Sequence, residues 1–239
     1  MTLRLTLATF FCIAVVIAIV LWPVGVPQDR FISNFEIRAD AEAAEKPELE
    51  LVILGTSLTA KYSWPEQLAE TLQTCLSQPV VLENVSVAGA NSSQAYEMAE
   101  QIATENPDLI LIEFAINDAD FLDGVSRSVS LTNHSELIFM LQQNYPEARL
   151  MLITTNPLSG LAILKRPRLG AYYLQYRDLA EIHDIGLADI YPRWLEIPLS
   201  QRRHPDGVHP DDAQMTEMMV PPLTGLIKAS RGNSEPCVS

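Results

Sequence analysis

Two segments far apart in the chain carry residue types that together can cleave an ester bond. Ser57 lies in the run LVILGTSLT at residues 51–59, and Asp206 and His209 lie in DGVHP at residues 206–210. A serine hydroxyl becomes a nucleophile when a histidine removes its proton and a carboxylate orients that histidine. Asp206 stands three residues before His209, a spacing that suits such a pair. The sequence therefore predicts a hydrolytic Ser-His-Asp triad.

Polar residues at the ends of other apolar runs suggest further members of the same site. Gly89 follows one apolar run and Asn117 follows the next. In an open α/β sheet the carboxyl ends of the strands share one edge, and ligands bind there. We therefore expect these residues to meet the triad loop at that edge. The N–H groups of Ser57 and Gly89 and the side-chain amide of Asn117 would then form an oxyanion hole, in which glycine lets the backbone approach closely.

At these positions the chain resembles the SGNH (GDSL) hydrolase family. The resemblance spans residues 49–228 and rests on four motifs that follow the family's order. They are GTSLT at 55–59, NVSVAG at 84–89, AIND at 115–118 and DGVHP at 206–210. The resemblance implies a flavodoxin-like fold of the SGNH type, with Ser57 as nucleophile and Asp206 and His209 completing the triad. It also implies Gly89 and Asn117 as oxyanion donors beside the Ser57 N–H.

Two residues depart from the family's pattern. Thr56 stands where the family usually has Asp, and Ala115 stands where it usually has Gly. Neither position supplies a group to the predicted chemistry. We expect Thr56 to change how the serine turn is supported, and the Ala115 methyl to narrow the pocket for the acyl group.

Two other interpretations of these residues are weaker. The nucleophile elbow of α/β-hydrolases is Gly-x-Ser-x-Gly, whereas Thr59 occupies the last position here and the serine follows the first strand. His204 is an alternative base, because His204-Pro205 stands five residues before His209-Pro210. The Asp-x-x-His spacing from Asp206 favours His209.

Apolar runs bounded by turn residues alternate with helical patterns along the chain. Strands alternating with helices, and apolar nearly throughout, indicate a parallel sheet covered on both faces. Right-handed crossovers then predict an α/β fold, a three-layer α/β/α sandwich with a central five-stranded sheet. The predicted strands are 49–54, 80–87, 109–116, 149–155 and 186–190, and the predicted helices are 65–76, 92–104, 130–145, 172–183 and 211–226. The connection 157–170, with Lys165, Arg166 and Arg168, is expected to be an irregular surface loop. The alternative is that this basic cluster binds an anionic substrate or a lipid head group.

The N-terminus predicts export. From Leu5 to Val26 the chain has no charged residue, about the length of a helix that crosses a bilayer. Arg4 before this run and Trp22 near its end suit an anchor with the rest of the chain outside the cytoplasm, in the periplasm or at the cell surface. A cleaved signal peptide is the alternative, although no small-x-small site follows the run directly. We expect an anchor at 1–27, a tether at 28–48, the hydrolase domain at 49–230 and a tail at 231–239.

Charge and composition exclude several other classes of function. A formal net charge of −14 argues against binding to nucleic acid. The four histidines show no metal-ligand spacing and the chain has no glycine-rich phosphate loop, so neither a metal nor another cofactor is expected. Cys75 and Cys237 can pair in an oxidising compartment, and the sequence leaves both the bridge and free thiols open.

These observations predict an exported, membrane-anchored serine esterase that works through an acyl-enzyme. Its substrate would be a small acyl ester, a glycan or a lipid, with short acyl groups such as those of O-acetylated glycans preferred, because few residues beyond the core remain to build a lipid tunnel. Alternatives within the enzyme class are a lysophospholipase or thioesterase, and an O-acyltransferase that passes the acyl group to a sugar hydroxyl. An alternative of another class is a non-catalytic SGNH-like module that binds a glycan or an envelope partner.

Overall fold

The structure, a computed structural model, describes residues 46–232 and residue 237. The strands are β1 (Leu49–Gly55), β2 (Val80–Ser86), β3 (Leu109–Ile112), β4 (Arg149–Thr154) and β5 (Gly186–Asp189). The helices are α2 (Ser57–Ala60), α3 (Trp64–Leu76), α4 (Ala95–Ala99), α5 (Ala115–Asp118), α6 (Arg127–Asn144), α7 (Ala162–Lys165), α8 (Leu169–His183), α9 (Tyr191–Glu196) and α10 (Asp212–Ser230), with a 3-10 turn, η2 (Leu199–Gln201).

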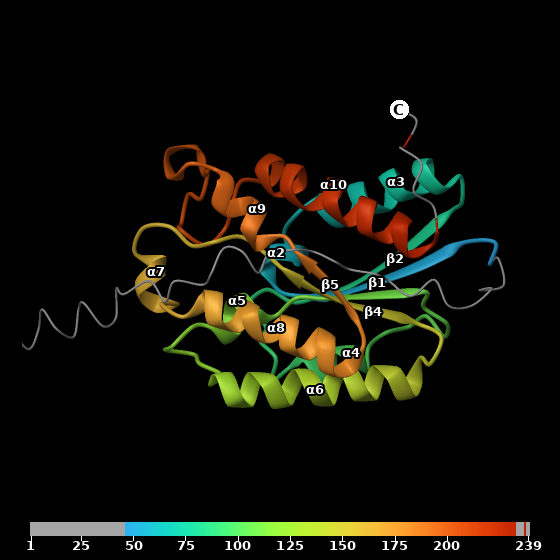
Figure 1. Ribbon diagram of the computed structural model, residues 1–239, viewed down its shortest axis with the longest axis horizontal. Coiled ribbons are helices and arrows are strands. Elements are labelled where there is room, and N and C mark those ends of the chain that lie inside the picture. Colours follow the sequence, from blue (N-terminus) through green and yellow to red (C-terminus); the bar gives the residue numbers. More distant parts are fainter. Residues whose placement is uncertain (1–45, 233–236, 238–239) are drawn as a thin grey trace, which may run out of the picture. The chain divides into compact units, whose positions relative to one another are not determined.

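The five strands form one parallel sheet in the order β2-β1-β3-β4-β5. Figure 1 shows α3 and α10 on one face of this sheet and α4, α6 and α8 on the other. The predicted three-layer α/β sandwich with a five-stranded parallel sheet is therefore confirmed. The strand order reverses beside β1, and such a switch point is where sheets of this type bind ligands. Ser57 follows β1 directly.

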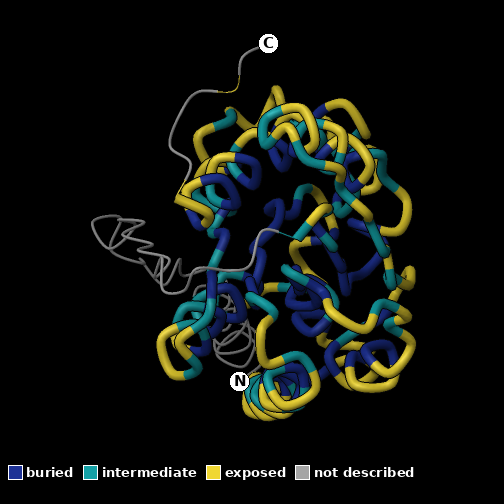
Figure 2. The backbone as a smooth tube through the Cα atoms, turned by 90° about the vertical axis from the view of Figure 1, so that its right-hand side faces the viewer, coloured by how far each residue is buried: buried dark blue, intermediate teal, exposed yellow. Residues whose placement is uncertain are grey.

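The core lies between the sheet and its two helical layers. Six of the seven β1 residues are buried, as expected for a central strand covered on both faces. Figure 2 shows buried residues through the middle of the domain, and exposed residues mainly on the outer helices and loops. The two longest helices, α6 and α10, begin at side-chain caps: the Ser126 hydroxyl accepts from the Val129 N–H at 3.3 Å, and the Asp211 carboxylate accepts from the Gln214 N–H at 2.7 Å. This buried sheet supports the loops at its carboxyl edge.

β3 is shorter than predicted. It ends at Ile112 rather than at residue 116, and the chain turns into α5. The N–H groups of Phe114 and Ala115 donate to the hydroxyl of Tyr176 at 2.9 and 3.0 Å. Because a side chain on α8 takes these donors, the sheet ladder stops there, and Asn117 lies on a helical turn rather than directly after a strand.

The helix predicted over residues 92–104 is also shorter, since α4 covers Ala95–Ala99. Beyond its end, the N–H groups of Ala103 and Thr104 donate to the carboxylate of Glu83 at 2.6 and 3.0 Å. A side chain on β2 therefore satisfies backbone groups that a longer helix would have used. The predicted connection 157–170 contains one helical turn, α7, and α9 and η2 were not predicted.

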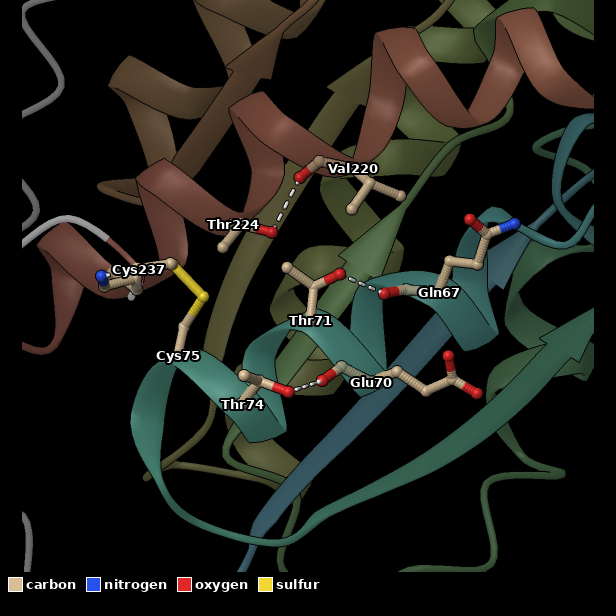
Figure 3. Close-up of a disulfide and its surroundings, with 9 residues drawn as sticks. Gln67, Glu70, Thr71, Thr74, Cys75, Val220, Thr224 and Cys237 are labelled. Atoms are coloured by element: carbon tan, nitrogen blue, oxygen red, sulfur yellow. Dashed lines mark hydrogen bonds between the residues drawn. A yellow bond between two sulfur atoms is a disulfide. The ribbon is translucent and has the colours of Figure 1, made fainter. Parts of the chain in front are cut away.

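A disulfide joins Cys75 to Cys237, with 4.8 Å between the Cα atoms, and so settles the question that the sequence left open. Figure 3 shows it between the last turn of α3 and the chain beyond α10. Cys75 lies close to the start of β2. The bridge is therefore at the amino ends of the strands, opposite the edge that carries Ser57.

Within residues 46–232, no helix has both the length and the apolar character needed to span a bilayer. The predicted anchor and the predicted tether up to residue 45 lie outside the described residues.

Candidate active site

Ser57, His209 and Asp206 form one continuous chain of hydrogen bonds. The Ser57 Oγ lies 2.8 Å from the Nε2 of His209, and the His209 Nδ1 lies 2.6 Å from the Oδ2 of Asp206. A carboxylate accepts only, so the Nδ1 of His209 carries the proton and its Nε2 is free to accept the serine hydroxyl proton. The structure thus brings together all three residues of the predicted triad.

The Asp206–His209 loop orients itself through local hydrogen bonds. The Oδ1 of Asp206 accepts from the N–H groups of Val208 and His209 at 2.9 and 2.7 Å. Partial burial raises the pKa of Asp206, but the hydrogen bonds from the His209 N–H, the His209 ring and the Val208 N–H outweigh it and lower this pKa to about 2. The carboxylate is therefore ionised at neutral pH and holds the imidazole by charge as well as by geometry.

Neighbouring segments fix the backbone of this loop. The hydroxyl of Tyr62 donates to the carbonyl of Pro210 at 2.7 Å, and the Asn156 amide donates to the carbonyl of Val208 at 2.7 Å. The Ser159 N–H donates to the carbonyl of Gly207 at 2.8 Å. Gly207 has a φ of +84°, and a Cβ there would lie 2.4 Å from the Ser159 carbonyl oxygen. Only glycine fits this close approach.

The turn that carries Ser57 rests on a buried carboxylate, Glu113. Its Oε1 accepts from the Thr56 N–H at 2.7 Å and from the Thr59 hydroxyl at 2.8 Å, and the Thr56 hydroxyl lies 3.0 Å from the same atom. Thr56 also caps α2 by accepting from the Leu58 N–H at 3.2 Å. Thr56 thus supports the serine turn through both its N–H and its hydroxyl; that this support differs from the support by the family's usual Asp stays a prediction.

The environment of Glu113 perturbs its acidity. Complete burial raises the pKa of Glu113 from its ordinary 4.5 to about 7, against the lowering effect of the hydrogen bonds from Thr56 and Thr59. A Cβ on Gly55 would lie 2.7 Å from the Glu113 Oε1, so the carboxyl group fills the space beneath the turn. The sequence signal for Glu113 was a single carboxylate within an otherwise apolar strand, and its role was not predicted.

The predicted oxyanion donors lie on two linked loops. The Asn117 Nδ2 donates to the carbonyl of Ala90 at 2.8 Å, and Ala90 follows Gly89, which has a φ of +85°. The Val87 N–H donates to the Gly55 carbonyl at 3.0 Å, so the Gly89 loop also meets the turn that carries the serine. One N–H of the Asn117 amide is used by Ala90, which leaves the second N–H for a substrate.

Behind Asn117 lies a buried histidine that the sequence analysis did not assign. The His134 Nδ1 lies 2.8 Å from the Ser130 carbonyl, which only accepts, so Nδ1 carries a proton. The Nε2 then accepts from the Tyr176 hydroxyl at 3.0 Å. Burial lowers the pKa of His134 despite the opposing attraction of Asp118. The ring is therefore neutral, and Tyr176, with its hydroxyl hydrogen engaged, accepts from the backbone of the α5 turn.

The carboxylate of Asp118 ties the α5 turn to two other segments. It accepts from the Ser92 N–H at 2.7 Å and from the Ser130 hydroxyl at 2.5 Å. Both contacts are buried. Asp118 therefore fixes the turn that precedes α4 and the first turn of α6 around Asn117.

His204 occupies a different environment from His209. Its ring packs edge-on against Trp194 at 5.7 Å between centroids. Neither ring nitrogen has a hydrogen-bond partner in the described part of the chain. Burial, together with repulsion from Arg202, lowers the pKa of His204. Of the two histidines that the sequence offered as base, His209 is the one that contacts Ser57.

Two expectations about neighbouring residues change. Ala115 is buried, so its methyl group packs inside rather than standing in an open pocket. Within the predicted surface loop 157–170, Lys165 and Arg168 are exposed as expected. Arg166 instead reaches inward to the carbonyl of Ile116 and the carboxylate of Asp120.

This geometry can be compared with known proteins. The sequence model of the GDSL-like Lipase/Acylhydrolase family matches residues 53–215. A protein from Vibrio mimicus named "Arylesterase" is 28% identical over 190 residues, a match that covers 74% of this chain and 85% of that protein. The matched region includes the serine turn and the triad loop.

Solved structures show the same fold. The lipase/acylhydrolase from Enterococcus faecalis matches with a TM-score of 0.65 at 19% identity, covering 80% of this chain and 100% of that one. Axe2, an acetylxylan esterase from Geobacillus stearothermophilus, matches with a TM-score of 0.63 at 16% identity, covering 81% of this chain and 99% of that one. At these identities the likeness is one of fold.

Proposed function

The chain belongs to the GDSL-like lipase/acylhydrolase family, and from this premise we propose that Ser57, His209 and Asp206 form its catalytic triad. The enzyme is a serine hydrolase that acts on ester bonds. The observation that carries the proposal is the hydrogen-bond chain from the Ser57 Oγ through His209 to Asp206, at 2.8 and 2.6 Å.

In the first half of the reaction, the Ser57 Oγ attacks the ester carbonyl carbon while the Nε2 of His209 takes the hydroxyl proton. The imidazolium then gives this proton to the leaving alcohol oxygen, which leaves an acyl-enzyme on Ser57. Water attacks the acyl carbon in the second half, with His209 again as base, and Ser57 is regenerated. Asp206 stays ionised and stabilises the imidazolium in both halves.

The developing oxyanion would be held by the N–H groups of Ser57 and Gly89 and by the free N–H of the Asn117 amide. Ser57 is the first residue of α2, where helix geometry leaves N–H groups without an intrahelical acceptor. Removing one such donor costs roughly 3–4 kcal/mol in comparable sites. Asn117→Ala should therefore lower kcat by about a hundredfold or more.

For the substrate we propose short acyl esters such as those of O-acetylated glycans. The described domain adds little chain to the α/β core, so it has little material for a long acyl tunnel. The fold likeness to an acetylxylan esterase supports an acetyl ester, and the match to a protein named arylesterase supports ester hydrolysis. Passing the acyl group to a sugar hydroxyl instead of water would need the same acyl-enzyme.

A lipid-type ester is the second candidate, favoured by apolar side chains near the Asn117 turn. Phe121 and Leu122 are exposed shortly after Asn117, and Leu161 and Leu164 are exposed on and beside α7. The Phe121 N–H donates to the Lys165 carbonyl at 2.9 Å, so the two segments lie together. A long acyl chain could bind along this apolar rim.

We further propose that the domain is exported and held at the membrane by residues 1–27. The uncharged run from Leu5 to Val26 supports an anchor. The Cys75–Cys237 disulfide supports an oxidising compartment, because such bridges persist mainly outside the cytosol.

Hydrolysis of a series of p-nitrophenyl esters, from acetate through butyrate and octanoate to palmitate, by the full chain in mild detergent tests this function. We expect the highest kcat/KM for acetate or butyrate, and no turnover by Ser57→Ala. A preference for octanoate or palmitate would favour the lipid-type ester. A folded wild-type protein without any turnover would contradict the esterase and favour a non-catalytic binding module.

A further inference from the structure

The side chain of Arg166 leaves the basic loop and enters the turn that carries Asn117. Its Nε donates to the Ile116 carbonyl at 2.9 Å, and its Nη2 lies 3.0 Å from the Oδ2 of Asp120. Only 12% of the side chain is exposed. The two partners stand on either side of Asn117 in the sequence, so a single guanidinium spans the turn.

The carbonyl that Arg166 binds is one that the short helix leaves unused. α5 is a single turn, and the Asp120 N–H that would bond to the Ile116 carbonyl in a longer helix bonds to the Asn117 carbonyl instead. A helix end needs partners for such carbonyl groups, and a cation suits the negative end of the helix dipole. Arg166 therefore caps the end of α5, which comes at Asp118, one residue after Asn117.

The guanidinium of Arg166, paired with Asp120, is suited to fix the geometry of the Asn117 turn and does more than add a positive charge. Arginine presents its donors in a rigid planar fork, which lysine cannot reproduce. Asp120 is itself held, because its Oδ1 accepts from the Leu122 N–H at 3.0 Å. The buried pair thus defines the path of the backbone from Ile116 to Leu122 and with it the direction of the Asn117 side chain.

The same connection also contacts the triad loop. At its start, Asn156 binds the Val208 carbonyl, and Ser159 packs against Gly207. At its end, Arg166 binds the Asn117 turn. Residues 156–166 therefore link the half of the site that carries the base to the half that carries the oxyanion donor.

We propose that Arg166 is a positioning residue, which holds the Asn117 amide at the oxyanion by capping α5 and pairing with Asp120. This inference rests on the proposed function, in which Asn117 donates to the oxyanion. Arg166 does not touch the substrate. Its effect on the reaction passes through Asn117 and is therefore lost when Asn117 lacks its amide.

A double-mutant cycle with Arg166→Met and Asn117→Ala tests this inference. Methionine keeps much of the apolar length of the side chain but removes all N–H donors. With p-nitrophenyl acetate we expect Arg166→Met to lower kcat by about 10- to 100-fold with little change in KM, since a small displacement of a catalytic group has effects of this order. In the Asn117→Ala background the same substitution should change kcat little. The matched control is Arg168→Met, in the same loop but exposed, which should leave kcat unchanged.

Equal losses from Arg166→Met in both backgrounds would overturn the inference and indicate general support of the fold. Wild-type kcat in Arg166→Met would overturn it as well. Full activity in a folded Asn117→Ala would reject the proposed oxyanion hole itself, and with it any role of Arg166 through Asn117. If Arg166→Met does not fold, Arg166→Lys keeps the charge beside Asp120 without the fork. We expect a lower kcat there, and a wild-type kcat would overturn the inference.

Discussion

The turn that carries Ser57 lies in the interior of the domain, whereas the loop that carries Asp206 and His209 lies at its surface. Ser57 is 7% exposed, and Glu113 beneath it is buried. The side chains of His209 and Asp206 are 30% and 56% exposed. One side of a single hydrogen-bond chain is therefore built into the core, and the other is added from a loop.

Because of this difference in burial, we expect substitutions in the serine turn to reduce stability and substitutions of Asp206 or His209 in the triad loop to reduce activity alone. The hydrogen bonds of the serine turn are buried, so removing an acceptor there leaves donors without partners at a cost to folding. The hydrogen bonds of the Asp206 carboxylate are local and partly solvated, so substitutions of Asp206 or His209 should change the chemistry and leave the fold nearly unchanged. The predictions below test the two sides of this contrast, together with one region that lies outside the site.

The largest effect is expected on the exposed side. His209→Ala removes the base and should lower kcat about 10⁴-fold or more. The unfolding free energy should change by no more than about 0.5 kcal/mol. Ester hydrolysis and urea unfolding measure the two quantities. The matched control is His204→Ala, in the same loop and packed on Trp194, which should retain its kcat. An equal loss in both variants would contradict the assignment of the base.

The disulfide lies away from both sides of the site, so breaking it should affect stability without affecting chemistry. Cys75→Ser opens a loop of 162 residues and should lower the unfolding free energy by about 2–5 kcal/mol. Its kcat at 25 °C should stay at the wild-type value. Cys12→Ser, at the remaining cysteine of the sequence, removes a thiol without breaking the bridge and serves as the control. Free thiols at both Cys75 and Cys237, found by alkylation of unreduced protein, would contradict the bridge.

On the buried side, Glu113→Ala should reduce both stability and activity. It removes the acceptor for the Thr56 N–H and the Thr59 hydroxyl, which should cost about 3 kcal/mol or more of unfolding free energy. Because these donors shape the serine turn, kcat should also fall. The exposed carboxylate of Glu97 gives the control variant, Glu97→Ala. If Glu113→Ala unfolds at the wild-type denaturant concentration, the serine turn does not depend on this carboxylate.

A smaller effect concerns the pH dependence of stability. Burial raises the pKa of Glu113 to about 7 from 4.5, so the folded state keeps a proton that the unfolded state has released between these values. Stability from this group is fully present below pH 4.5 and is lost as pH rises to about 7, by at most about 3 kcal/mol. Glu113→Gln removes this titration. We expect the wild-type melting temperature, relative to that of Glu113→Gln, to fall between pH 4.5 and 7. A difference between the two melting temperatures that stays constant from pH 4.5 to 7 would contradict the raised pKa of Glu113.

Much of the architecture could be predicted from the sequence. Continuous apolar runs such as 49–54 and 149–155 mark buried parallel strands, and the four motifs bring their polar residues to one edge of the sheet. The serine, histidine and aspartate that form the hydrogen-bond chain were all identified in this way. Such local patterns are strong because burial on both faces of a strand leaves few polar residues.

The supporting residues could not be found from local patterns. Tyr176 on α8 accepts the N–H groups of Phe114 and Ala115 after β3, and Glu83 on β2 accepts those of Ala103 and Thr104 beyond α4. Both override local preference through contacts between segments distant in sequence. Arg166 resembled its exposed neighbours Lys165 and Arg168 because only tertiary packing distinguishes it. Glu113 left a signal, as a carboxylate in an apolar strand, but its partners depend on the register of β1 and β3.

Labelling with a fluorophosphonate probe tests most directly whether Ser57 is the activated nucleophile. The full chain would be treated in mild detergent beside Ser57→Ala, and the adduct located by peptide mapping. We predict a stoichiometric adduct on Ser57 that is absent from the mutant. An adduct on another residue, or no adduct on a folded protein that still hydrolyses esters, would contradict Ser57 as the nucleophile.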